Sequence, residues 1–391
     1  MSHRLRSPQV MLLIDTSSVY GRELIEGIGR YAAEHGPWSI HHEDRGLYDP
    51  LPPSLNRWPG DGIVARSVRK ADLKKLLATG LPVVELFADF ALSPPQVSPS
   101  EDSIGCLAAE HLLERGLRNL AYFASDWAWW IDTRRKAFAR AVAQFDAPCR
   151  YFELQPSGPG RKRFDERTLI RWLDGLPKPC GVFCACDVYA IQVTNACRRR
   201  DIAVPAQIAV LGVDNDPVVC SVSFPPLSSV DLNSRRVGYE AAALLDRMMA
   251  GQPPPQKNIL VEPSRVVTRE STDMVAVDDA DVAQAVRMIR EHACRGLRVN
   301  DVVEAVGLSR RVLQQRFKCI LKRTPKEELM RVQIDRARML LIQTEMSVEQ
   351  IAKCTGFAAF AYFIRAFRRE MGVTPLTYRK KSRVPGSHPD L

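Results

Sequence analysis

Hydrophobic residues follow two different periods along the chain. Up to about residue 270, short apolar runs alternate with stretches in which apolar residues recur every three or four positions. The short runs predict buried strands, and the longer stretches predict amphipathic helices. Such alternation is typical of an α/β fold, in which helices cover both faces of parallel sheets. From about residue 280 only the helical period remains, which predicts a second, all-α domain.

The predicted strands and helices of the α/β part fall into two successive groups, which indicates two similar lobes. The strands are expected at residues 10–14, 38–42, 62–65, 81–86, 119–123, 150–153, 181–185 and 209–213. The helices are expected at residues 21–35, 73–78, 101–116, 134–144, 166–174 and 190–200.

The all-α part contains one helical pattern twice. The first copy covers residues 297–318 and the second covers residues 346–368. In each copy a short amphipathic helix is followed by a glycine, Gly307 or Gly356, where positive φ allows a tight turn. A second helix follows, with two buried apolar side chains four residues apart. This arrangement is typical of a helix-turn-helix unit.

The second helix of each copy leaves a set of side chains facing outward. These are Arg310, Arg311, Gln314, Gln315 and Lys318 in the first copy and Phe360, Ala361, Ile364, Arg365 and Arg368 in the second. Arg and Gln can form paired hydrogen bonds with guanine and adenine edges in the major groove of DNA. We expect base contacts from Arg311, Gln314, Gln315 and Arg365, and phosphate contacts from Arg310, Lys318, Arg368 and Arg379.

Residues 325–344 form an uninterrupted helical pattern between the two copies. At about 1.5 Å per residue, such a helix spans roughly 30 Å. Successive major-groove faces of B-DNA are roughly 34 Å apart, so one chain can reach two adjacent grooves. A helical bundle with no role in DNA binding would explain the apolar stripes, but neither the duplication nor the outward Arg and Gln side chains.

Charge is distributed unevenly along the chain, whose net charge is +10. Residues 280–391 hold 22 Lys and Arg against 11 Asp and Glu, whereas the other 279 residues hold 33 against 34. The positive excess therefore belongs to the all-α part. A basic domain joined to a nearly neutral one suggests a module that contacts phosphates, carried by a sensor or oligomerisation module.

These motifs resemble two known families. The duplicated unit, together with the terminal pattern Gly372-x-Thr374-Pro375-x-x-Tyr378-Arg379, resembles the DNA-binding domain of the AraC/XylS transcription regulators. The α/β part resembles the sugar-binding core of the LacI/GalR regulators, which shares its fold with periplasmic sugar-binding proteins. The segments that carry this second resemblance are 102–112, 117–123, the strand end at Asp187, 202–205, 211–215 and 226–230.

A LacI-like core followed by an AraC-type tail is similar to the xylose-operon regulators of the XylR type. The resemblance implies a periplasmic-binding-protein-like effector domain at residues 1–275 and a double helix-turn-helix domain at residues 276–391. It further implies a homodimeric activator that binds double-stranded operator DNA, responds to D-xylose or another pentose, and works with RNA polymerase at catabolic genes. The alternative within the same architecture is a regulator that senses a different monosaccharide or a sugar derivative.

Ligand residues are expected at the carboxyl ends of the strands, in the cleft between the lobes. The candidates are Asp15, Tyr20, Arg22, Trp127, Trp129, Arg134, Asp187, Asp214 and Asn215. Carboxylate, amide and guanidinium groups suit a polyol because each hydroxyl both donates and accepts hydrogen bonds, and a tryptophan face packs against a sugar ring. By resemblance, Asp187, Asp214, Asn215 and Arg134 hold positions that contact sugar in the LacI-like fold.

Each candidate also has a structural interpretation that the sequence leaves open. Asp214 and Asn215 fit a turn at the end of a strand, and Arg134 fits a pair with a structural carboxylate. Trp127 and Trp129, with Trp130, fit a hydrophobic plug or a contact between subunits.

Other classes of protein receive little support. The chain has no apolar run of the roughly 18 residues that a membrane span requires, and its N-terminus does not match a signal peptide, so a cytoplasmic protein is expected rather than a transport component. The ten cysteines lack the spacing of a disulfide framework. Cys180, Cys184 and Cys186 fit a buried strand better than a zinc site. No catalytic motif is present, so neither enzymatic activity nor a cofactor is expected.

Overall fold

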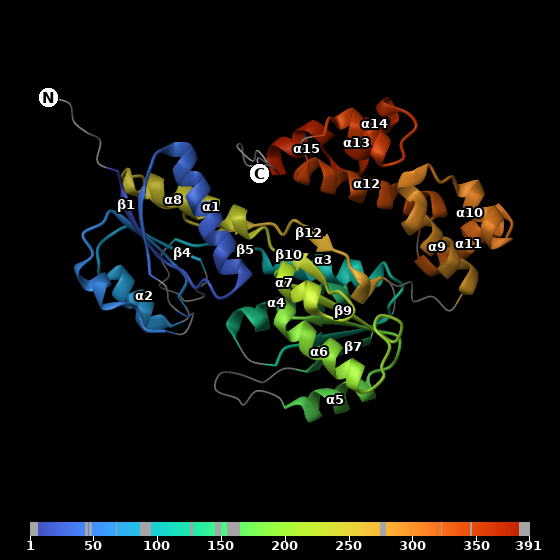
Figure 1. The fold of residues 1–391 in the computed structure, drawn as a ribbon, viewed down its shortest axis with the longest axis horizontal. Coiled ribbons are helices and arrows are strands. Elements are labelled where there is room, and N and C mark those ends of the chain that lie inside the picture. Colours follow the sequence, from blue (N-terminus) through green and yellow to red (C-terminus); the bar gives the residue numbers. More distant parts are fainter. Residues whose placement is uncertain are drawn as a thin grey trace. The chain divides into compact units, whose positions relative to one another are not determined.

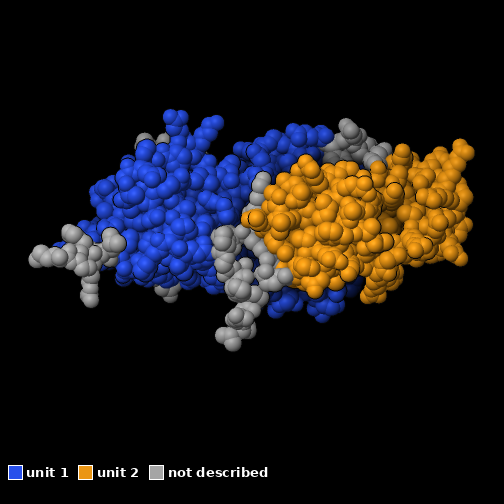
Figure 2. Space-filling view, turned by 90° about the horizontal axis from the view of Figure 1, so that it is seen from above, with its two compact units in different colours: residues 1–112, 118–273 blue, residues 113–117, 274–391 orange. Residues whose placement is uncertain are grey.

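The computed structural model describes residues 7–43, 46, 49–67, 69–86, 95–125, 128–144, 150–154, 165–273, 279–321, 323–344 and 346–382. The chain divides into two compact units (Figure 2). Unit 1 comprises residues 1–112 and 118–273, and unit 2 comprises residues 113–117 and 274–391.

Unit 1 is an α/β structure with two lobes, each built on its own sheet (Figure 1). In lobe 1 the strand order is β2-β1-β3-β4, and in lobe 2 it is β12-β10-β9-β8-β6-β7. Neighbouring strands are parallel except β10 and β12. The strands of lobe 1 are β1 (Gln9–Leu13), β2 (Ser39–His42), β3 (Gly62–Ala65) and β4 (Val83–Glu85). Those of lobe 2 are β6 (Asn119–Phe123), β7 (Arg150–Leu154), β8 (Cys180–Cys184), β9 (Ile208–Val213), β10 (Ser228–Asp231) and β12 (Arg265–Val267).

Helices and a short strand pair complete unit 1. The helices are α1 (Val19–His35), α2 (Lys70–Leu77), α3 (Glu101–Leu113), α4 (Trp129–Ala143), α5 (Glu166–Gly175), α6 (Asp187–Arg199), α7 (Pro217–Val222) and α8 (Ser234–Met249), with 3-10 turns at Pro53–Arg57 and Glu270–Thr272. Strands β5 (Val97–Pro99) and β11 (Ile259–Val261) pair in parallel. The chain runs from lobe 1 into lobe 2 through β5, and it returns from α8 to β12 through β11. The lobes are therefore joined by extended segments rather than by a shared sheet.

Helices α1 and α8 pack closely in lobe 1 because each has a glycine at the contact (Figure 1). A Cβ atom on Gly27 would lie 2.0 Å from the carbonyl oxygen of Arg235, and one on Gly238 would lie 2.0 Å from that of Leu24. Any other residue at either position would have to push the two backbones apart.

Unit 2 is a set of helices around two apolar cores. It contains α9 (Ala280–His292), a 3-10 turn (Ala293–Arg295), α10 (Val299–Val306), α11 (Arg310–Leu321), α12 (Pro325–Gln343), α13 (Val348–Cys354), α14 (Phe360–Met371) and α15 (Pro375–Ser382). Leu313 and Phe317 are fully buried in the first core, and Phe363 and Phe367 are fully buried in the second. These are the two pairs that the repeated pattern predicted.

The two glycine turns that the sequence predicts in unit 2 are confirmed. Gly307 and Gly356 have φ values of +72° and +82°. Thr324 caps α12, where its Oγ1 accepts a hydrogen bond from the Glu327 backbone N–H at 3.2 Å. Ser347 caps α13 in the same way, at 3.1 Å from the Gln350 N–H.

No helix in the described parts of the chain has the length and apolar character needed to cross a lipid bilayer.

The glycine contact between α1 and α8 yields a stability prediction. Gly238→Ala should lower the free energy of unfolding of unit 1 by about 1–3 kcal/mol, because the new methyl group overpacks the interface. Urea denaturation followed by tryptophan fluorescence measures this change. The control is Gly29→Ala on α1, where a Cβ atom meets nothing within 4 Å. That substitution should be neutral or should stabilise by about 0.5–1 kcal/mol, and equal losses in both variants would contradict the packing account.

Candidate functional sites

A cavity of about 630 Å³ in unit 1 receives side chains from both lobes. This volume lies within the range of roughly 300–1,000 Å³ that is usual for small-molecule sites. The polar and aromatic residues in its wall are Asp15, Ser17, Ser18, Tyr20, Arg66, Gln96, Ser98, Ser100, Glu101, Asp102, Trp129, Trp130, Thr133, Arg134, Arg140, Asp214 and Asn258. Five expected ligand residues, Asp15, Tyr20, Trp129, Arg134 and Asp214, are therefore brought together around one cavity.

The turn between β1 and α1 places Asp15 in the cavity wall. The Asp15 carboxylate accepts hydrogen bonds from the Ser17 N–H at 3.0 Å and the Ser18 hydroxyl at 3.4 Å. Ser18 in turn caps α1 by accepting from the Gly21 N–H at 3.2 Å. A Cβ atom on Gly21 would lie 1.7 Å from the Asp15 carbonyl oxygen, so glycine is required for this close turn.

Arg66 joins Asp15 and Tyr20 on the lobe 1 side of the cavity. Its guanidinium lies 3.5 Å from the Asp15 carboxylate and 4.9 Å from the centre of the Tyr20 ring. All three residues are less than 9% exposed. Burial raises the pKa of Tyr20 well above its usual value, so its hydroxyl remains protonated and can donate a hydrogen bond.

Arg134 and Glu101 form a buried ion pair on the lobe 2 side. The guanidinium binds both carboxylate oxygens, at 2.7 and 2.9 Å, and donates a third hydrogen bond to the Ala185 carbonyl at the end of β8. It also lies 5.0 Å from the centre of the Trp130 ring. The structural carboxylate that the sequence left open is therefore Glu101. Arg134 nevertheless lines the cavity.

Asp214 faces the cavity from the end of β9, in a backbone conformation with φ of +104°. Part of its surface stays open to the cavity, but the surrounding protein is dense enough for burial to raise the pKa of its carboxyl group to about 7. The positive charges of Arg134 and Arg66 act in the opposite direction and keep the pKa from rising further. Asp214 therefore changes charge near neutral pH.

Charge in the cavity wall is balanced pair by pair. Arg66 faces Asp15, Arg134 faces Glu101, and Arg140 faces Asp102. Among the described lining residues, Asp214 is the carboxylate left over after these pairs are formed. The wall thus has no surplus positive charge with which to attract an anion.

Three expected ligand residues, Arg22, Asn215 and Asp187, do not line the cavity. Arg22 stabilises the β1–α1 turn, because its guanidinium donates hydrogen bonds to the carbonyls of Thr16 and Ser17, at 2.9 and 3.1 Å. The Asn215 side-chain oxygen accepts from Arg269 at 2.8 Å. Trp127, which was also expected in the site, lies outside the described residues.

Asp187 organises the strand ends behind the cavity. It is 1% exposed, and its carboxylate accepts hydrogen bonds from the Ser229 hydroxyl at 2.6 Å and the Asp216 N–H at 2.9 Å. Burial, followed by the nearby charge of Asp214, raises the pKa of Asp187 well above its usual value. Its partners connect β10 with the loop that carries Asp214, so Asp187 positions that loop.

The cavity wall also includes residues that were not expected from the sequence. Arg66 directly follows strand β3, so the rule that ligands bind at carboxyl ends of strands would have found it. Glu101 begins a helix and looks like an ordinary first-turn acid. Gln96 and Asn258 belong to the segments between the lobes and hydrogen bond to each other at 2.9 Å. No sequence pattern links two residues so far apart.

In unit 2, helices α11 and α14 carry the side chains expected to contact DNA. Arg310, Arg311, Gln315 and Lys318 on α11 and Phe360, Ala361, Arg365 and Arg368 on α14 are exposed, whereas Gln314 and Ile364 are partly buried. Ile364 packs against the second apolar core. Most of the side chains expected to contact DNA are therefore accessible to solvent on both helices.

The two groups of helices in unit 2, one around each apolar core, are connected by hydrogen bonds from Gln333. Gln333 on α12 donates to the Ala293 carbonyl at 2.9 Å and to the Gly356 carbonyl at 3.4 Å. Gly356 has positive φ, and a Cβ atom there would lie 2.6 Å from the Ala293 oxygen. Arg379, which is expected to contact phosphate, donates hydrogen bonds from its guanidinium to the carbonyls of Leu341 and Met346 and thereby anchors α15.

The cysteines do not form a metal site in the described part of the chain, where no group of three or more potential ligands occurs. Cys180 and Cys184 are fully buried in β8. Burial raises the pKa of Cys180 to about 12, which favours the neutral thiol over the thiolate that binds metals.

Comparisons with known proteins identify two domain families in separate parts of the chain. Residues 109–272 match a periplasmic binding protein-like domain family, and residues 302–381 match a helix-turn-helix domain family. The chain is 31% identical over 382 residues to the xylose operon regulatory protein of Escherichia coli K12, covering 95% of this chain and 96% of that protein. The corresponding protein of Haemophilus influenzae is also 31% identical, over 95% and 98%. The solved structure of the xylose-binding transcription activator xylR is similar with a TM-score of 0.61 and 30% identity, covering 96% of this chain and 99% of that one.

The buried pair in the cavity wall yields a second stability prediction. Glu101→Gln should destabilise unit 1 by about 3–5 kcal/mol, because it leaves the Arg134 charge buried without its counter-ion. The control is Asp102→Asn, one residue along, where an exposed pair with Arg140 is worth at most about 1 kcal/mol. Urea denaturation compares the two variants. Similar losses in both would mean that the Arg134 pair contributes no more than a surface pair.

Proposed function

Because the chain belongs to the family of xylose operon regulatory proteins, we propose that it is a transcription activator that binds D-xylose in the cavity of unit 1 and operator DNA through α11 and α14. The active species is a homodimer that works with RNA polymerase at promoters of pentose catabolic genes. The observation that carries the proposal is the combination, in one chain, of a charge-balanced cavity between two lobes and a pair of exposed, basic recognition helices.

The chemistry of the cavity supports an uncharged sugar. Asp214 can accept hydrogen bonds from sugar hydroxyls, Tyr20 can donate one, and the rings of Trp129 and Trp130 offer apolar faces for the C–H surface of a pyranose. Sugar acids and sugar phosphates would add negative charge beside Asp214 without a cation left to receive it. The pairing of the arginines therefore favours a neutral monosaccharide over a sugar derivative.

The proposed mechanism uses the extended connections between the lobes. A sugar that binds side chains from both lobes favours the closed arrangement over the open one by the difference in its affinity for the two. The exposed apolar side chains of Val218, Val222 and Phe224, which are 65%, 71% and 67% exposed, support a subunit contact next to α7. Closure would alter that contact and the spacing of the paired DNA-binding domains.

Two functions from other classes fit less well. A transport component would not need recognition helices such as α11 and α14. Enzymatic activity is not expected, since the relatives are regulatory proteins.

The pKa of Asp214 predicts how sugar affinity depends on pH. The ionised carboxylate accepts hydrogen bonds from the sugar, and the protonated form, which accumulates below pH 7, does so less well. The affinity for D-xylose should therefore fall about tenfold between pH 8 and pH 6. Calorimetric titration of the full chain at several pH values measures it.

In the same experiment Asp214→Asn should bind more weakly at pH 8 and lose the pH dependence. A wild-type affinity that is constant over this range, or a pH dependence that survives in Asp214→Asn, would refute the assigned role. Absence of D-xylose binding at every pH would refute the proposed effector.

The recognition helices predict separable effects on DNA binding. Arg311→Ala should reduce discrimination at one base position by about 1–3 kcal/mol, because a bidentate contact to a base edge is lost. Lys318→Ala should weaken binding to all sequences alike and lower the salt dependence by about one phosphate contact. Selection from a random duplex library, followed by anisotropy titrations at several salt concentrations, distinguishes them. If Arg311→Ala weakened all sequences equally, its assignment to base contact would be wrong.

A further inference from the structure

Helix α3 belongs to both compact units. Residues 101–112 are part of unit 1, and its last residue, Leu113, is grouped with residues 114–117 in unit 2. A helix of 13 residues is a stiff rod of about 20 Å. Displacement at its start is therefore carried to its end.

The start of α3 lies in the wall of the cavity. Ser100, Glu101 and Asp102 all line it, and Glu101 holds the buried guanidinium of Arg134. A ligand that contacts Arg134 or the backbone at Ser100 therefore acts directly on the first turn of this helix.

The last turn of α3 is fixed beside the second point at which the chain leaves unit 1. The ring Nε2 of His111 lies 2.9 Å from the hydroxyl of Thr272. That hydroxyl donates to Ser228 at 2.7 Å, and Thr272 is fully buried. The chain passes into unit 2 after residue 112 and again after residue 273. The buried hydrogen bond between His111 and Thr272 therefore joins the two chain segments that lead out of unit 1.

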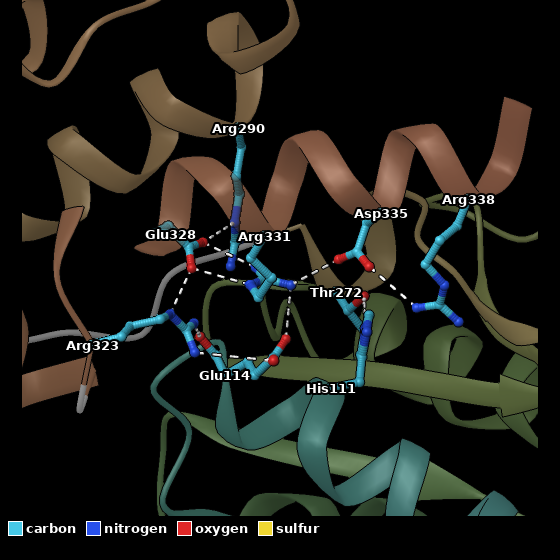
Figure 3. Close-up of polar contacts among 9 residues, drawn as sticks. All are labelled: His111, Glu114, Thr272, Arg290, Arg323, Glu328, Arg331, Asp335 and Arg338. Atoms are coloured by element: carbon cyan, nitrogen blue, oxygen red, sulfur yellow. Dashed lines mark hydrogen bonds and ion pairs between the residues drawn. The ribbon is translucent and has the colours of Figure 1, made fainter. Parts of the chain in front are cut away.

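Immediately beyond α3, Glu114 is held by two arginines of unit 2 (Figure 3). Its carboxylate lies 2.9 Å from a guanidinium nitrogen of Arg331 and 4.0 Å from one of Arg323. Its backbone carbonyl, one residue past the end of the helix, accepts a hydrogen bond from Arg323 at 3.1 Å. Side chain and backbone of Glu114 are thus both held by cations at the start of α12.

Both arginines are fixed by Glu328, which is fully buried. The Glu328 carboxylate lies 2.6 Å from Arg323, 2.9 Å from Arg331 and 3.9 Å from Arg290 on α9. Burial alone would raise the pKa of Glu328, but Arg331 and Arg323 outweigh it and lower the pKa to about 2. The carboxylate is therefore charged under all physiological conditions, and it connects α12 with the first apolar core.

The ionic contacts continue along α12 toward the second helix-turn-helix unit (Figure 3). Arg331 also lies 3.2 Å from Asp335, which lies 3.3 Å from Arg338. Arg338 donates to the hydroxyl of Tyr378 on α15 at 3.2 Å. A single chain of contacts thus reaches from Glu114 to helices that pack in both cores of unit 2.

We propose that Glu114 is the residue through which sugar binding acts on the DNA-binding domain: α3 carries the movement from the cavity, and Arg323 and Arg331 receive it at α12. Glu114 contacts neither sugar nor DNA, so it is a positioning residue. The inference deepens the proposed function and depends on it.

The test measures how strongly sugar and DNA binding are coupled in the full-length protein. Anisotropy gives the affinity for a labelled duplex of about 40 base pairs, long enough for two dimer half-sites, enriched from a random library with the wild-type protein. The measured quantity is the ratio of DNA dissociation constants without and with saturating D-xylose. The reciprocal ratio, for D-xylose without and with DNA, must be equal if the coupling is thermodynamic.

In Glu114→Gln this ratio should fall to within about twofold of one, while the D-xylose affinity without DNA stays within about twofold of wild type. The matched control is Glu110→Gln, the same change one turn earlier on α3, which should keep the wild-type ratio. Melting curves of both variants verify that they are folded.

Three results would overturn the link: Glu114→Gln with the wild-type ratio, Glu114→Gln with impaired D-xylose binding in the absence of DNA, or Glu110→Gln with the same loss of coupling. A failure of the proposed function would give a different result. The DNA affinity of the wild-type protein would then not change with D-xylose, and this would refute both the proposed function and the role of Glu114.

Discussion

The buried ion pair between Glu101 and Arg134 is the contact on which the cavity depends. An isolated guanidinium that is 3% exposed would be strongly disfavoured, so the two groups must stay together in the folded protein. The pair fixes the first turn of α3 against α4, and the hydrogen bond to Ala185 adds the end of β8. Because Glu101 neutralises Arg134, the charge of this arginine is not available to attract an anionic ligand. The same contact thus sets the shape of the cavity, its preference for uncharged ligands and the starting position of the helix that leads to unit 2.

Much of the fold could be predicted because strands such as β1, β3, β8 and β9 are buried and many of the helices are amphipathic. Strands at residues 62–65 and 119–123 were placed at the observed bounds. Helix α4 was expected from residue 134 but begins at Trp129, because the preceding Ala128 has no side chain to signal a cap. The pair β5–β11 could not be predicted, since each strand has three residues and their partners are distant in sequence. Short strands of this kind are defined by tertiary contacts.

The cavity was predictable where its residues follow long buried strands. Asp15 lies two residues past the end of β1, Asp214 directly follows β9, and both line the cavity. The sequence could not show that Asp187, also at a strand end, turns its carboxylate toward Ser229 rather than the cavity. It also could not show which carboxylate pairs with Arg134, because Glu101 lies 33 positions away. Hydrophobic patterns in the sequence predict where helices and strands lie. The direction of a polar side chain depends on hydrogen-bonding partners that only the folded chain brings close.

The most direct test of the account is a tryptophan fluorescence titration of the full-length protein with D-xylose and, in parallel, with D-xylonate. Trp129 and Trp130 line the cavity and report on its occupancy. We expect a saturable change with D-xylose and none with D-xylonate, because the arginines in the wall are already paired with carboxylates. A saturable response to D-xylonate with none to D-xylose would contradict it.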